Sequence, residues 1–244
     1  MNRKEIRTMP HKKIIIGIEF NNRSTRGKEW RIGLRKSWIE YRMSIFMKYT
    51  LRSLKKQTNQ NFTALIRYAD RTEQLIQQTL MKYKPLPRNI RFVRESLYIP
   101  TQRKLCRGYP YLYLVRLDCD DVYHKSFIQQ LSKFHPKPGT QALINQRGYV
   151  YDSVRHRIAN ITKYSPPFYT LIYRTKAYFQ GKRYRLPGGH TAVIRLKHEI
   201  LNKKGKRNYM VVVHRRNTLN QRLLAKGKFT KNRSKVRAVL RKYI

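Results

Sequence analysis

The 244-residue sequence has few acidic residues, only two cysteines and no long apolar segment. Twelve Asp and Glu residues accompany 56 Lys and Arg residues, so the formal net charge is +44. Cys106 and Cys119 are too few for a disulfide framework or a multi-cysteine zinc module. The aliphatic runs at 14–16 and 210–213 are far shorter than the roughly 18 residues of a membrane span. Residues 1–18 are basic but lack the apolar core and cleavage site of a signal peptide. These absences indicate a cytoplasmic globular protein with reduced thiols.

Apolar residues nevertheless make up 40% of the chain, which is enough for a sizeable core. The large positive charge predicts an anionic partner: a nucleic acid, an anionic lipid surface or a phosphorylated small molecule. Composition does not distinguish among these three.

Apolar periodicity predicts an α/β chain with a strand-rich second half. We expect a basic tail at 1–11, one domain at 12–217 and a second basic tail at 218–244. Ligands of such sheets lie at the carboxyl ends of the strands. The predicted strands are 12–20, 62–69, 90–95, 110–117, 142–151, 157–163, 168–174, 191–196 and 208–214, the predicted helices 38–57, 73–84 and 125–134, and residues 21–33 are predicted to be a loop.

Three of the twelve acidic residues, Asp118, Asp120 and Asp121, directly follow the most strand-like run. Like charges repel, so such a cluster indicates a bound cation. Residues 118 and 120 of a strand project to one face, which would place two oxygen donors side by side for Mg²⁺ or Mn²⁺. The alternative is a solvated turn whose acids cap the following helix.

The segment 116–121 (RLDCDD) resembles the D-x-D signature of GT-A glycosyltransferases. Residues 42–62 are similar to the first helix and turn of rhamnosyltransferases of that superfamily, and 167–172 is similar to a downstream stretch. The resemblance extends over 12–217. It implies a GT-A-like mixed sheet flanked by helices, followed by a strand-rich extension.

The resemblance also implies a metal site. Asp118 and Asp120 would bind the ion, and His214 would be a further ligand late in the domain. Because imidazole suits Mn²⁺ better than Mg²⁺, the set favours manganese. The alternative for His214 is a hydrogen-bonded residue at a strand end.

The same resemblance implies a site for the nucleotide sugar, in which Asp118 also takes part. Phe20 and Asn21 would line the nucleoside pocket, Asp70 would accept the N–H of a pyrimidine base, and Arg103 would contact the diphosphate. The alternatives are a turn for Phe20 and Asn21, a helix N-cap for Asp70 and a surface residue for Arg103.

Inverting sugar transfer needs a base that deprotonates the acceptor hydroxyl. Few candidates follow Asp121 in the sequence. Asp152 and His190 are equally good candidates, and Glu199 ranks below them.

These features together predict transfer of a sugar, such as rhamnose, from a dTDP- or UDP-linked donor. The acceptor would be a hydroxyl of a cell-surface glycan or glycolipid precursor. The basic surface would attract anionic lipids at the inner face of the cytoplasmic membrane.

Two other function classes remain open. The positive charge and the eighteen tyrosines would also suit a nucleic-acid-binding protein without catalysis. The paired carboxylates would suit a metal-dependent nuclease. No Walker P-loop, G-x-S-x-G or H-E-x-x-H motif occurs.

Overall fold

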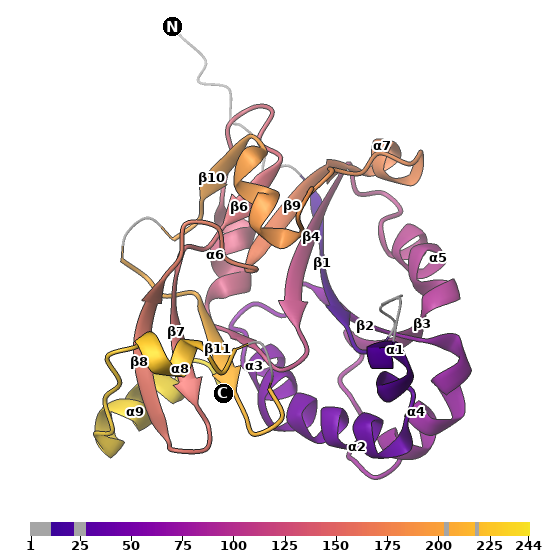
Figure 1. Cartoon of the computed structure of the whole chain (residues 1–244). Coiled ribbons are helices and arrows are strands. Elements are labelled where there is room, and N and C mark those ends of the chain that lie inside the picture. The colour runs from indigo at the N-terminus through magenta and orange to yellow at the C-terminus, as the bar shows by residue number, and fades with distance from the viewer. Residues whose placement is uncertain (1–10, 22–27, 203–204, 218–219) are drawn as a thin grey trace, which may run out of the picture.

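The larger of two β-sheets in the computed structural model has seven strands and mixed directions (Figure 1). The structure describes residues 11–21, 28–202, 205–217 and 220–244. The strand order is β10-β6-β9-β4-β1-β2-β3, and β9 is antiparallel to both β4 and β6. The mixed α/β fold expected from the sequence is confirmed. The strands are β1 (Lys12–Glu19), β2 (Thr63–Tyr68), β3 (Ile90–Arg94), β4 (Tyr111–Asp118), β6 (Ala142–Ile144), β9 (Tyr169–Arg174) and β10 (His198–Ile200).

Alternation along β1 divides the larger sheet into two faces. Ile14, Ile16 and Ile18 join the main core with α2 (Lys36–Ile45), α4 (Glu73–Leu80) and α6 (Phe127–Lys133). Ile15 lies on the opposite face, in a smaller core with α5 (Glu95–Leu105) and α7 (Thr175–Phe179). The predicted helix 38–57 is confirmed, because α2 continues through a π-helical turn into α3 (Leu51–Lys55).

A second sheet of four strands, ordered β5-β11-β7-β8, packs against the main core. Its strands are β5 (Val122–Tyr123), β11 (Tyr209–Val213), β7 (Arg147–Asp152) and β8 (Arg157–Thr162). Strand β11 is parallel to β7, although 56 residues lie between Asp152 and Tyr209 in the chain.

The C-terminal basic segment folds back onto this second sheet. It contains α8 (Leu223–Lys226) and α9 (Arg233–Leu240). Val236 and Tyr243 are buried in the core beneath α9, and Thr230 exchanges two backbone hydrogen bonds with Ile158. Residues 220–244 therefore contribute to the fold rather than forming a solvated end.

Several predicted elements differ from the structure. Residues 28–33 form α1 (Lys28–Gly33) instead of a loop, while residues 22–27 of that loop and 1–10 of the expected tail lie outside the described residues. The predicted strand 142–151 is two strands, one in each sheet, and β10 and α5 were not predicted. Residues 191–196, predicted as a strand, lie mostly in a 3₁₀ turn (His190–Arg195) that follows two glycines with positive φ.

Among the described residues, no helix is both long enough and apolar enough to cross a bilayer.

Candidate active site

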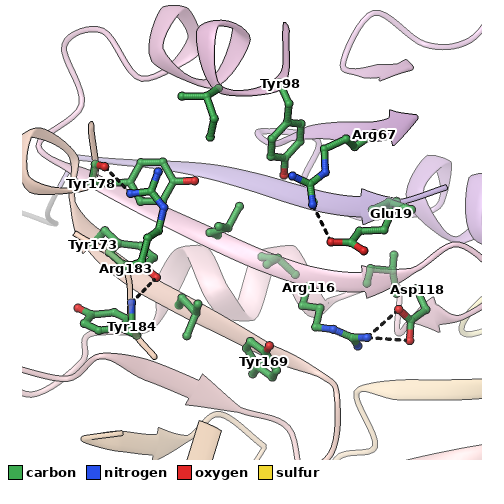
Figure 2. A pocket seen from close by; sticks show the side chains of 17 residues that line it. Glu19, Arg67, Tyr98, Arg116, Asp118, Tyr169, Tyr173, Tyr178, Arg183 and Tyr184 are labelled. Carbon is green, nitrogen blue, oxygen red and sulfur yellow. Dashed lines mark hydrogen bonds and ion pairs between the residues drawn. The ribbon is translucent and has the colours of Figure 1, made fainter. Parts of the chain in front are cut away.

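A cavity of about 380 Å³ opens on the larger sheet, on the face that carries α5 and α7 (Figure 2). It lies along the C-terminal halves of β1 and β4, and Tyr98 of α5 and Tyr178 of α7 also line it. Residues 17 and 19 of β1 and 114, 116 and 118 of β4 reach it by strand alternation. Its polar and aromatic lining residues are Glu19, Arg67, Tyr98, Arg116, Asp118, Tyr169, Tyr173, Tyr178, Arg183 and Tyr184.

Two arginine–carboxylate pairs stand side by side at the strand ends (Figure 2). Arg116 donates to both oxygens of Asp118, at 2.8 and 3.1 Å. Arg67 donates to Glu19 at 2.7 Å, and its guanidinium lies 4.7 Å from the centre of the Tyr98 ring. Glu19 and Asp118 are partners in the register of β1 and β4. Arg67 also donates to Glu95 at 3.1 Å, and Arg116 donates to the carbonyl of Pro167 at 2.7 Å. Each guanidinium has five N–H donors, so N–H groups remain that could bind a phosphate oxygen.

Asp118 is therefore the expected site residue that lines the cavity. Glu19, Arg67 and Arg116 were missed from the sequence. The alternation of β1 and β4 could have indicated Glu19 and Arg116, since both share a face with Asp118 at the strand ends.

Asp120 lies beyond the end of β4 and is largely buried. Its Oδ2 atom is 3.3 Å from Nε2 of His214 and 3.3 Å from Nδ2 of Asn217. Burial alone would raise the pKa of Asp120, but the hydrogen bond from His214 and the charge of Arg42 lower it below its usual value. Asp120 is therefore ionised, and it lies beside His214, the residue that the family resemblance groups with it in a metal site.

Tyr41 holds the imidazole of His214 in place and is itself covered by an arginine. The hydroxyl of Tyr41 is 3.0 Å from Nδ1 of His214, which leaves Nε2 directed at Asp120. The guanidinium of Arg216 lies 4.4 Å from the centre of the Tyr41 ring.

Asp121 has a different role, because it fixes the turn. Its carboxylate accepts the backbone N–H of Val212 at 3.0 Å, and its carbonyl accepts the hydroxyl of Thr50 at 2.9 Å. Burial, followed by the charges of Asp120 and Asp118, raises the pKa of Asp121 well above its usual value. These contacts tie the turn to β11 and to the helix that follows α2.

Strand β4 ends at Asp118, so strand alternation, on which the predicted shared face of residues 118 and 120 depended, does not extend to Asp120. The two carboxylates contact different partners. Within the described ranges, no three His, Cys, Asp or Glu side chains are grouped closely enough to share one ion. Asp120 and His214 still offer one oxygen and one nitrogen donor. Since metal ions at phosphate sites commonly use one or two protein ligands plus phosphate and water, this pair fits an ion that binds together with a diphosphate.

Phe20 and Asn21 have structural roles. Phe20 belongs to the main core and makes edge contacts with Trp38 and Phe92. Asn21 is buried, donates to Gly33 and Thr72 and accepts the N–H of Ala69, which ties the ends of β1 and β2 together. Neither is among the described residues lining this cavity, so their place in a nucleoside pocket stays a prediction.

Asp70 and Arg103 also lie outside that lining. Asp70 is exposed at the end of β2 and accepts the backbone N–H of Ser96, at the start of α5, at 3.3 Å. Arg103 donates to the carbonyl of Phe179 and stacks on its ring, which links α5 to α7.

The expected bases are distributed over the fold, and none is among the described lining residues. Asp152 accepts the N–H groups of Val154 and Arg155 and pairs with Arg157 at 2.8 Å. Glu199 accepts from Lys137 and Thr140, both at 2.7 Å. These contacts disfavour a general-base role for either carboxylate. His190 is exposed at the start of its 3₁₀ turn.

Comparison with known proteins adds a family assignment. The sequence profile of the family described as "Putative rhamnosyl transferase" matches residues 17–173. No curated protein matches the chain significantly.

Several solved structures are similar at low identity. TarS 1–349 from S. aureus is 13% identical, with a TM-score of 0.42 over 82% of this chain and 60% of that one. The structure of the same protein in complex with UDP is 14% identical in sequence, with a TM-score of 0.40, again over 82% of this chain and 60% of that one. A structure titled "putative nucleotide-diphospho-sugar transferase", from Desulfovibrio desulfuricans G20, is 15% identical with a TM-score of 0.35, over 79% of this chain and 80% of that one. The chain thus spans about 60% of the length of TarS 1–349. Because the family profile covers more than half of the sequence, the protein belongs to this rhamnosyl transferase family, and the resemblance to that family seen in the sequence is confirmed.

Proposed function

We propose that the protein transfers a sugar from a nucleoside-diphosphate donor to a hydroxyl group. The observation that carries this proposal is the cavity at the carboxyl ends of β1 and β4, with Asp118 in its wall. Open α/β sheets bind ligands at this position, and membership of the family supports the same chemistry.

The cavity offers complementary groups for each part of such a donor. Arg67 and Arg116 would bind diphosphate oxygens through N–H groups not used by their carboxylate partners. Asp118 would accept a hydroxyl of the ribose. Tyr98 and Tyr169 present aromatic surface to the flat parts of the base or sugar.

Asp120 and His214 would hold a divalent ion, with Mn²⁺ favoured over Mg²⁺ by the imidazole. When bound, such an ion offsets the negative charge of the departing diphosphate. The chain itself orients the two ligands: Tyr41 fixes the imidazole, and Asp121 fixes the turn that carries Asp120.

The finer features of the reaction belong to the same proposal. The donor would carry dTDP or UDP, the transferred sugar would be rhamnose, and the acceptor would be a glycan or glycolipid precursor. His190 stays the candidate base, since its imidazole is exposed. Helix α9 exposes Arg233, Lys235 and Arg237, which would attract an anionic membrane surface.

Titration calorimetry with UDP and dTDP, with and without Mn²⁺, tests this function. We expect Asp118→Asn to weaken nucleotide binding roughly tenfold, because it removes one charge-assisted acceptor. Glu73→Gln is the matched control, since Glu73 pairs with Arg94 at an exposed position and is not among the described lining residues.

Equal nucleotide affinity of the Asp118→Asn variant and the wild type would contradict the proposal. Tight binding of a DNA or RNA strand at moderate salt, unaffected by the substitution, would support the nucleic-acid-binding alternative instead.

A further inference from the structure

Arg42 is a cation that the fold already places beside the candidate metal ligands. It lies on α2, and its Nη1 atom is 3.9 Å from Oδ2 of Asp120. About a quarter of its side chain is exposed, with a relative accessibility of 26%. The guanidinium also lies 5.4 Å from the centre of the Trp38 ring, so it is held between an aromatic side chain and a carboxylate.

The hydrogen bonding of this guanidinium is incomplete. Its buried Nε makes no hydrogen bond of good geometry within the described residues, and the group beside the guanidinium is the buried thiol of Cys119, a weak acceptor. A buried unpaired donor costs free energy, so its retention indicates a partner that arrives with a ligand.

The carboxylate of Asp120 is also loosely held. His214 and Asn217 both approach the same oxygen at 3.3 Å, beyond the usual 2.7–3.2 Å of a good N–H···O bond. Arg42 is further away still, at 3.9 Å. Three groups therefore surround one oxygen, and none of them bonds to it tightly.

We propose that Arg42 makes the binding of a divalent ion at Asp120 and His214 conditional on the donor diphosphate. This inference rests on the proposed function. Without nucleotide, the guanidinium repels the ion and competes with it for Asp120. With nucleotide, the diphosphate attracts both cations, and Arg42 gains an anionic partner.

The size of the effect follows from Coulomb's law. An ion bound at Asp120 would lie within about 6 Å of the guanidinium. At that separation, and with the dielectric constant of bulk water, repulsion between a divalent ion and a unit charge lowers the affinity of the protein for the ion about tenfold. Removal of the charge from Arg42 therefore strengthens ion binding to the free protein about tenfold. The same removal weakens nucleotide binding at saturating ion. A role limited to packing would not move the two affinities in opposite directions.

The experiment compares the wild type with Arg42→Gln and Arg42→Lys. Mn²⁺ affinity is measured by electron paramagnetic resonance or calorimetry, first on the free protein and then at saturating UDP or dTDP. We expect the wild type to bind Mn²⁺ at least tenfold more tightly with nucleotide than without. Arg42→Gln should bind Mn²⁺ about tenfold more tightly without nucleotide, and should bind nucleotide about tenfold more weakly at saturating Mn²⁺. Arg42→Lys should behave like the wild type because it keeps the charge.

Arg94→Gln is the matched control, because it removes a positive charge from an exposed ion pair with Glu73. Circular dichroism and the melting temperature of each variant identify misfolding, and Arg42→Met, which also removes the charge, replaces Arg42→Gln if that variant is unstable.

Unchanged or weaker Mn²⁺ affinity of folded Arg42→Gln, with nucleotide binding intact in the wild type, overturns the inference alone. Nucleotide binding that is equal with and without Mn²⁺, and lost in Arg42→Gln, also overturns it, because Arg42 would then replace the ion. Failure of the wild type to bind either nucleotide, with or without Mn²⁺, overturns the proposed function and this inference together.

Discussion

Gly17 and Tyr98 are coupled across the wall of the cavity, and this coupling can be measured. A Cβ atom added at Gly17 would lie 2.6 Å from the hydroxyl oxygen of Tyr98, whereas its next neighbour, in Leu114, is 3.7 Å away. Gly17→Ala must therefore displace the tyrosine. The displacement needed to reach ordinary van der Waals distance is about 0.8 Å.

Tyr98 cannot move freely, because its side chain is 8% exposed and lies beneath the guanidinium of Arg67. Overpacking of this kind costs about 1–3 kcal/mol of folding free energy. Tyr98→Phe removes the obstructing oxygen, so the substitution at Gly17 should cost less than about 1 kcal/mol in that background. Urea unfolding of the wild type, both single variants and the double variant gives the coupling energy.

Nucleotide titration of the same four proteins relates this coupling to the site. Gly17→Ala should weaken UDP or dTDP binding, and Tyr98→Phe should restore part of it, because the displaced ring occupies the cavity. An equal cost of Gly17→Ala in both backgrounds would refute the reasoning, since the contact with the hydroxyl would then not be the source of the strain.

Two further predictions concern residues outside the cavity. Burial, followed by the charges of nearby lysines, lowers the pKa of His124 to about 4. Between this pH and the ordinary pKa of 6.5, the unfolded chain therefore binds a proton at His124 that the folded chain does not. Stability should fall by about 1–2 kcal/mol as the pH decreases through this range, after allowance for partial exposure, and His124→Asn should reduce that dependence in urea unfolding at pH 4.5 and 7. Asp152→Asn should destabilise the protein by about 1–3 kcal/mol, because it weakens the pair with Arg157 and the turn after β7, yet turnover per folded molecule should change little. A large loss of turnover without destabilisation would instead restore Asp152 as the base.

The regular strands were predictable because their apolar patterns are local. The predicted strands 12–20, 62–69, 90–95 and 110–117 correspond to β1–β4 within two residues at each end. Helix α5 was missed because it begins directly after β3 and contains Pro100, which normally indicates a helix boundary. Its contacts with the sheet, through Tyr98, outweigh that local signal.

The site was predictable only in part, since side-chain pairing depends on register between distant strands. The aspartate cluster and His214 stood out by residue type, and the structure brings Asp120 and His214 together. Arg67 could not be distinguished among 56 basic residues before its strand was aligned with Glu19. The place of Phe20 in the main core follows from the alternation of Ile14, Ile16 and Ile18, which the sequence analysis did not extend to it.

Strand β11 connects the smaller sheet to the proposed ion site, which lies just beyond the end of β4 in the larger sheet. His214 is the residue directly after β11, and Val212 within that strand holds the carboxylate of Asp121. Any local opening that detaches β11 from β7 therefore separates imidazole from carboxylate, even while the seven-stranded sheet stays intact. Loss of ion binding at the proposed site would then show that residues 209–213 have separated from the neighbouring strands before the whole molecule unfolds.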